Sequence, residues 1–243
     1  MNASYSPLTI SVIARKGGVG KSMCTTLFAR AYANSGLRVL VVDLAPQATT
    51  TKALLTREQV RELDIEESSS AFAAGESLLP YLTKSPQRGL RVAPSGEPLE
   101  LASDRLRLDA LALSNVQESL STLADAQADL VIIDTPPDYG TLTLGALSFA
   151  RWAVVVSECK RESVQEVPQA LKTIARLKSL NPSLSLLGIV ANKLDRRRSE
   201  VNKAMKPVPS VDFRAHGLPA VVEVAEELLR RHSAATRKMA HAG

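Results

Sequence analysis

Continuous apolar runs alternate along this chain with segments in which apolar residues recur at helical spacing. Short continuous runs are typical of strands that are buried on both faces of a parallel sheet, and helical spacing is typical of the helices that cover such a sheet. The predicted strands are residues 8–14, 37–43, 130–134, 152–157 and 186–192, and residues 90–96 are predicted to form a short strand with a Pro-Ser turn. The predicted helices are residues 22–33, 49–63, 71–82, 99–126, 164–180 and 219–232, with an acidic, serine-rich separator at 64–70. This order predicts an α/β fold in which a mostly parallel sheet of about seven or eight strands has helices on both faces.

A glycine-rich segment joins the first predicted strand to the first predicted helix. It reads Arg15-Lys16-Gly17-Gly18-Val19-Gly20-Lys21-Ser22. Glycines let successive backbone N–H groups turn toward phosphate oxygens, and the following helix points its positive dipole end at the same anion. We expect Lys21 to reach the β- and γ-phosphates of a nucleoside triphosphate, and the Ser22 hydroxyl to ligate Mg²⁺. Strand, loop and helix together predict a P-loop NTPase fold.

Lys16 distinguishes this segment from a plain phosphate-binding loop, which needs no lysine before its first glycine. The run from Lys16 to Ser22 resembles the deviant Walker A motif of the ParA/MinD group of nucleotide-dependent dimerising ATPases. The resemblance implies that ATP and Mg²⁺ are the cofactors. It also implies that Lys16 reaches the nucleotide of a second subunit, which couples ATP binding to homodimerisation. The residues expected to contact ATP in the loop are Lys16, Gly17, Gly18, Val19, Gly20, Lys21, Ser22 and Met23.

Two of the predicted strands end in an aspartate. Asp43 resembles the start of the family's second aspartate motif, and Asp134 resembles its Walker B element. The carboxyl ends of parallel strands are where open α/β sheets bind ligands. Mg²⁺ keeps several waters and takes one or two protein carboxylates. The resemblance therefore implies that Asp43 and Asp134, together with Ser22, position Mg²⁺ and its waters.

Position 45 departs from the family pattern. The family has a second aspartate there, which is credited with positioning the attacking water, whereas this chain has Ala45. A methyl group accepts no hydrogen bond, so hydrolysis loses a group worth roughly 10²–10⁴-fold in rate. We expect ATP binding through Lys16 and Lys21 to persist, catalytic turnover to be weak or absent, and the ATP-bound dimer to accumulate. A natural alanine and an engineered one would have the same effect at this position.

The composition suits one α/β domain over residues 1–243, since 45% of the residues are hydrophobic and 23% are charged. No apolar run approaches the length of a membrane span, and the N-terminus lacks the features of a secretory signal, so a cytoplasmic protein is predicted. Seven residues precede the first strand, so the resemblance is to ParA forms without an N-terminal helix-turn-helix domain. Cys24 and Cys159 are isolated, which argues against a disulfide or a metal centre.

Positive charge is concentrated in the last fifth of the chain. Residues 1–190 carry 19 basic and 19 acidic residues, whereas residues 191–243 carry 11 and 6, which is the whole net charge of +5. Such a concentration, without interleaved aromatic residues, favours sequence-independent contact with DNA phosphates over a merely solvated basic surface. ParA-type ATPases bind non-specific DNA, so the resemblance implies a nucleoid-associated protein. The candidate DNA-binding residues are Arg196, Arg197, Arg198, Lys203, Lys206, Arg214, Arg230, Arg231, Arg237 and Lys238.

Asn192 ends the last predicted strand of the sheet. In the family an asparagine at this place contacts adenine, and a later proline segment, which Pro209 resembles here, covers the base. A strand-terminal asparagine is also a common turn former. The run from Asn192 to Asp195 matches the guanine-reading motif of GTPases as well, but Lys16 and the second aspartate motif favour adenine.

Three functions are compatible with this phosphate loop. The favoured one is DNA segregation, in which an ATP-bound homodimer holds non-specific double-stranded DNA until hydrolysis, stimulated by a ParB-like centromere-binding protein, releases it. A MinD-like membrane-cycling ATPase needs an apolar C-terminal helix face, and residues 233–243 offer only Met239, so no membrane partner is expected. A small-molecule ligase on the same fold stays open, although it has no need for a basic C-terminal region.

Overall fold

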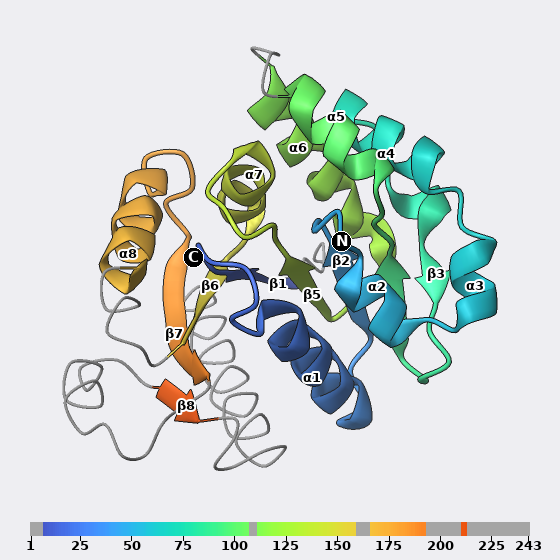
Figure 1. Ribbon diagram of the computed structural model, residues 1–243, viewed down its shortest axis with the longest axis horizontal. Coiled ribbons are helices and arrows are strands. Elements are labelled where there is room, and N and C mark those ends of the chain that lie inside the picture. Colours follow the sequence, from blue (N-terminus) through green and yellow to red (C-terminus); the bar gives the residue numbers. More distant parts are fainter. Residues whose placement is uncertain (1–6, 107–110, 159–165, 193–209, 213–243) are drawn as a thin grey trace, which may run out of the picture.

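The computed structural model describes residues 7–106, 111–158, 166–192 and 210–212, and these contain an eight-stranded sheet (Figure 1). The strand order is β3-β4-β2-β5-β1-β6-β7-β8, and all neighbours are parallel except β3 and β4. The strands are β1 Leu8–Ile13, β2 Val39–Asp43, β3 Thr83–Lys84, β4 Leu90–Ala93, β5 Leu130–Asp134, β6 Trp152–Glu158, β7 Ser185–Asn192 and β8 Ser210–Asp212. The predicted mostly parallel α/β fold is confirmed.

Helices cover both faces of this sheet. Helices α1 and α2 lie on one face, whereas α4 to α8 lie on the other. The helices are α1 Lys21–Asn34, α2 Thr49–Leu54, α3 Arg57–Arg61, α4 Ile65–Ala74, α5 Pro98–Leu106, α6 Ala112–Ser121, α7 Thr141–Phe149 and α8 Glu166–Leu177, with 3₁₀ turns η1 Leu79–Tyr81 and η2 Thr122–Ala126. In the part of the chain that the structure describes, no helix combines the length and the apolar character needed to cross a bilayer.

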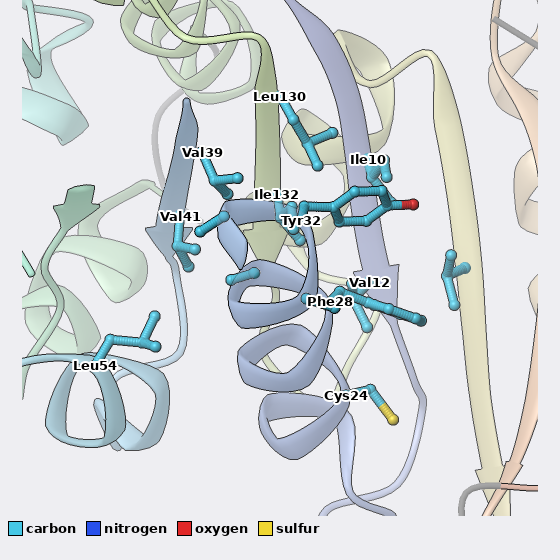
Figure 2. Close-up of a cluster of buried hydrophobic side chains, with 14 of the residues drawn as sticks. Ile10, Val12, Cys24, Phe28, Tyr32, Val39, Val41, Leu54, Leu130 and Ile132 are labelled. Atoms are coloured by element: carbon cyan, nitrogen blue, oxygen red, sulfur yellow. The ribbon is translucent and has the colours of Figure 1, made fainter. Parts of the chain in front are cut away.

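The alternation of side chains along each strand supplies a hydrophobic core on each face of the sheet. The core on the α4–α8 face consists of two clusters, one around α4 to α7 and one around α7 and α8. In β2, Val41 points toward α1, while Val42 points into the core on the opposite face. Figure 2 shows Phe28 and Tyr32 of α1 packed over the strands, with Cys24 one turn before Phe28. Burial raises the pKa of the Cys24 thiol to about 12, which keeps it a neutral, packed side chain.

The phosphate loop follows a central strand, so it lies in the middle of the row formed by the carboxyl ends of the strands. Strand β1 lies between β5 and β6, so the chain leaves β1 toward β2 on one side and later passes from β5 to β6 on the other. Such a reversal opens a crevice at the carboxyl ends of the strands, where α/β sheets bind ligands. The pairing of β2 with β5 sets Asp43 directly beside Asp134 at the carboxyl ends of these strands.

The predicted single helix over residues 49–63 is wrong, because the chain forms α2 and α3 in its place. Leu55 is extended, with φ −115° and ψ 159°, and Thr56 then starts α3 with a capping box to Gln59. The predicted separator at 64–70 is also wrong. Asp64 caps α4 by accepting a hydrogen bond of 3.0 Å from the Glu67 N–H, so the acidic, serine-rich stretch is itself helical.

Other predicted boundaries also changed. The long helix predicted over 99–126 is described as α5, α6 and η2, with residues 107–110 outside the described ranges. The pattern did not predict the two-residue β3 or the short β8. The helix predicted at 219–232 lies outside the described residues.

Close packing of α6 on α7 requires a glycine at position 145. A Cβ at Gly145 would lie 2.8 Å from the Val116 Cβ, closer than packed carbon atoms approach. We expect Gly145→Ala to lower the free energy of unfolding by about 1–3 kcal/mol, as overpacked cores do, with the loss measured by urea denaturation. Adding Val116→Ala should recover part of that loss specifically in the Gly145→Ala background. A Gly145→Ala protein as stable as the wild type would contradict this packing account.

Candidate nucleotide-binding site

The phosphate loop between β1 and α1 has backbone conformations that only glycine adopts without strain. Gly18 and Gly20 have φ of 75° and 97°, in the left-handed region. At Gly17 and Gly18 an added Cβ would meet nothing within 4 Å, so the front of the loop is open to a ligand. At Gly20 an added Cβ would collide with the side-chain amide of Asn192. The loop is therefore open at Gly17 and Gly18, which we call its front, and packed against Asn192 at Gly20, which we call its back.

Lys21, at the start of α1, is buried under the loop. Its Nζ donates a hydrogen bond of 3.1 Å to Asp134 Oδ1, and the Thr50 hydroxyl donates one of 2.6 Å to the other Asp134 oxygen. Lys21 is 7% exposed and Asp134 is fully buried. A buried ion pair with these additional hydrogen bonds fixes the lysine in place. Lys16, by contrast, is exposed on the front of the same loop.

Asp43 is held by donors from the segment that follows β2. Its Oδ1 accepts a hydrogen bond of 3.1 Å from the Ala45 N–H, and its Oδ2 accepts from the Thr51 N–H at 2.8 Å and the Thr51 hydroxyl at 2.9 Å. Burial, followed by the neighbouring Asp134 carboxylate, raises the pKa of Asp43 to about 7 against these hydrogen bonds. Two carboxylates side by side in a buried setting favour a nearby cation.

Ala45 contributes its backbone to this arrangement. Its N–H donates to Asp43, and its carbonyl accepts a hydrogen bond of 2.9 Å from the Ser95 hydroxyl. Its side chain is a methyl group that lines the cavity in front of the loop together with Pro46 and Gln47. The segment thus keeps its fold at position 45 while presenting no hydrogen-bond acceptor there.

The cavity in front of the loop measures about 670 Å³, large enough for a nucleoside phosphate. Its floor is the phosphate loop with Met23, and its walls come from α5 and from residues 136–138 and 140–142. Ser22 lines the cavity, whereas Asp43 and Asp134 lie buried behind it. An open glycine loop, a serine hydroxyl at the cavity and two carboxylates behind it fit a nucleotide with Mg²⁺.

Asn192 lies against the phosphate loop. Its side-chain amide donates a hydrogen bond of 2.8 Å to the Val19 carbonyl, and it is 6% exposed. The contact fastens the back of the loop to the end of β7. Its predicted contact with adenine stays a prediction. Pro209 and the ten candidate DNA-binding residues, from Arg196 to Lys238, lie outside the described residues.

The sequence reasoning missed the hydroxyl groups that support the two aspartates. Thr50 bonds to Asp134, Thr51 bonds to Asp43, and the Ser95 N–H donates a 3.0 Å hydrogen bond to the Thr51 hydroxyl oxygen. The threonine run at 49–51, just after the second aspartate motif, was the available signal. It also missed Glu100 and Asp104 of α5, which line the cavity one helical turn apart.

Comparisons with known proteins agree with this geometry. The AAA_31 family model, described as an AAA domain, matches residues 8–186. The chromosome partitioning protein ParA of Caulobacter vibrioides is 31% identical over 221 residues, 88% of this chain and 78% of that protein. The chromosome-partitioning ATPase Soj of Thermus thermophilus is 33% identical over 189 residues, 77% of this chain and 70% of that protein.

A solved structure shares the same architecture. The cobyrinic acid a,c-diamide synthase from Mycobacterium smegmatis, solved with bound ADP and magnesium, matches with a TM-score of 0.80 and 27% identity, over 93% of this chain and 96% of that one. The span matched by the family model contains the phosphate loop and both strand-end aspartates. The chain therefore belongs to the AAA_31 family of ParA/MinD-type P-loop domains.

Proposed function

We propose that this chain is an ATP-dependent DNA-segregation protein whose ATP-bound homodimer holds double-stranded DNA without sequence preference. The observation that carries the proposal is the phosphate loop with its two differently placed lysines. Lys21 is buried against Asp134, whereas Lys16 is exposed on the open front of the loop. Relatives named ParA and Soj carry the chromosome-partitioning function, which supports the same assignment for this chain.

Within one subunit, the loop N–H groups from Gly17 to Ser22 bind the phosphates, and Lys21 supplies a charge already desolvated and oriented. The Ser22 hydroxyl would ligate Mg²⁺, with Asp43 and Asp134 behind it to orient its waters. The ion, when bound, neutralises charge on the β- and γ-phosphates. Lys16 extends from the same loop toward a second subunit. ATP binding and dimerisation are thereby coupled.

The basic residues from Arg196 to Lys238 supply the contacts with DNA, and they make the protein nucleoid-associated in the cytoplasm. A ParB-like centromere-binding protein stimulates hydrolysis and so releases DNA. The whole chain acts as one ATPase domain with its DNA-binding surface in residues 191–243. Because Ala45 offers no acceptor to an attacking water, this chain stays longer in the ATP-bound, DNA-holding state.

A second candidate rests on the structural match to cobyrinic acid a,c-diamide synthase at 27% identity. A small-molecule synthase would use the same cavity for ATP and for its second substrate. It would have no use for a net charge of +5 in the last fifth of the chain. DNA binding therefore separates the two candidates.

Binding of random-sequence duplex DNA tests the proposed function. We expect tight binding with ATP and Mg²⁺, weak binding with ADP or without nucleotide, and a steep fall in affinity as salt rises, because phosphate contacts release counterions. Fluorescence anisotropy at two salt concentrations measures this. Absence of binding in every nucleotide state would refute the DNA-segregation proposal and favour the synthase.

Restoring a carboxylate at position 45 should restore turnover. The backbone bonds of Ala45 do not depend on its side chain, so Ala45→Asp should keep the local fold and place an acceptor in the cavity. We expect the steady-state ATPase rate to rise by roughly 10²–10⁴-fold. Ala45→Leu is the matched control, because leucine has nearly the shape of aspartate but no hydrogen-bond acceptor, and its rate should stay at the wild-type level. Equal rates for Ala45→Asp and the wild type would exclude the proposed defect.

Removing the exposed lysine should uncouple nucleotide binding from assembly. We expect Lys16→Ala to bind ATP with the affinity of the monomeric wild type and to remain a monomer, as measured by light scattering with and without Mg²⁺ and ATP. Lys21→Ala is the contrasting variant, since it removes the buried charge paired with Asp134 and should lose ATP binding itself. A Lys16→Ala protein that dimerises like the wild type would show that Lys16 has no role across the interface.

A further inference from the structure

An electropositive groove of about 570 Å³ borders the nucleotide cavity on the α8 side of the molecule. One wall is formed by Arg15 and residues 137–139, and the other is formed by α8 residues that include Lys172 and Arg176. Figure 1 shows α8 at the left of the molecule, far from α3 at the right. The groove lies in residues 1–190, whose basic and acidic residues balance, and so outside the C-terminal region in which composition predicts the DNA contacts.

The spacing of residues along α8 places its buried residues and its groove-lining cations on different sides of the helix. Val167, Ala170, Ile174 and Leu177 are its buried residues, and they hold the helix against the sheet. The polar residues that line the groove recur one turn apart on another side of the helix: Gln169, Lys172, Thr173 and Arg176. Four residues of helix advance by about 6 Å, so the Lys172 and Arg176 side chains leave the helix about that far apart along its axis.

The charges of this groove are not balanced inside the molecule. Arg15, Lys172 and Arg176 are all exposed, and the salt bridges formed among the described residues involve none of them. Asp138 is the carboxylate in the lining, and its Oδ1 already accepts a 2.8 Å hydrogen bond from the Gly140 N–H. Glu166 at the start of α8 adds a second carboxylate near the groove: burial raises the pKa of the Tyr139 phenol, and Glu166 is close enough to raise it further. Three cations against these two carboxylates leave a net positive charge, which favours an anionic ligand.

The groove and the nucleotide cavity share a wall. Pro137 and Asp138 line both spaces, and Arg15 directly precedes Lys16 of the phosphate loop. A nucleotide that moves the loop or residues 137–138 therefore also changes the shape of the groove. The two spaces are therefore adjacent and share these two residues.

We propose that this groove binds the phosphate backbone of duplex DNA through Arg15, Lys172 and Arg176, an inference that rests on the proposed DNA-segregation function and adds a contact site to it. Each strand of a duplex carries a phosphate about every 3.4 Å along the axis, so cations about 6 Å apart reach separate phosphates of one strand. Exposed lysine and arginine tips contact such a backbone without reading sequence. The shared wall gives the nucleotide a direct way to control this contact.

The test compares the wild type with Lys172→Ala/Arg176→Ala in ATP-dependent binding of random-sequence duplex DNA over a range of salt. Each phosphate contact contributes about 0.9 to the slope of log affinity against log salt, so the loss of two contacts should flatten the slope by about 1.8. Affinity at 0.1 M salt should fall by roughly 10- to 60-fold on the same relation. ATP binding and dimer mass should stay unchanged, because neither residue touches the nucleotide cavity.

The chain offers a matched control. Arg57 and Arg61 of α3 are also exposed arginines one turn apart, and neither forms a salt bridge among the described residues. We expect Arg57→Ala/Arg61→Ala to bind DNA like the wild type. Equal losses in both double variants would reflect total charge and would overturn the proposal for the groove.

Other outcomes separate this proposal from the proposed function. If Lys172→Ala/Arg176→Ala binds DNA with the wild-type affinity and the same salt slope, the groove proposal is overturned and the proposed DNA-segregation function is not affected. No DNA binding by the wild type in any nucleotide state would refute the proposed function, and the groove proposal with it. Binding of a ten-residue polyglutamate peptide that is lost in the double variant, alongside unchanged DNA binding, would make the groove a site for acidic protein segments and overturn the proposal.

Discussion

The site depends on the buried pair of Lys21 and Asp134. A charged lysine under a phosphate loop is costly to bury, and its carboxylate partner 3.1 Å away makes the arrangement stable. Asp134 lies at the end of β5, beside Asp43 of β2. The Lys21–Asp134 ion pair therefore connects the phosphate loop to these two paired strands. Thr50 and Thr51 then bind the segment after β2 to these carboxylates. Removing either charge would leave the other buried without a partner, which disturbs folding as well as binding.

Much of the fold could be predicted because the strands are continuous apolar runs and the phosphate loop has a fixed spacing. The predictions failed where local capping opposed periodicity. Thr56 and Asp64 each begin a new helix, and hydrophobic spacing alone does not reveal such breaks. In the site, the loop and its aspartates could be recognised from sequence. The Asn192 contact with Val19 joins residues 173 positions apart, and the groove joins Arg15 to α8, so both depend on tertiary packing.

In the proposed function, the residue at position 45 separates nucleotide binding from ATP hydrolysis. The backbone at Ala45 holds Asp43 and Ser95 in place, so the segment around the nucleotide is complete. The side chain lacks the acceptor that would orient water, so the account predicts strong binding with slow chemistry. The proposed ParB-like partner would then stimulate hydrolysis from a low basal rate.

The most direct test of this account is the identity of the nucleotide in the isolated complex. The protein would be incubated with Mg²⁺ and ATP, separated by size, and the nucleotide in each fraction quantified by anion-exchange chromatography. The account predicts a fraction of dimer mass that contains intact ATP at one molecule per chain. A protein that elutes as a monomer with ADP would contradict it, because that result would mean that hydrolysis proceeds without Asp at position 45 and that ATP does not hold the dimer.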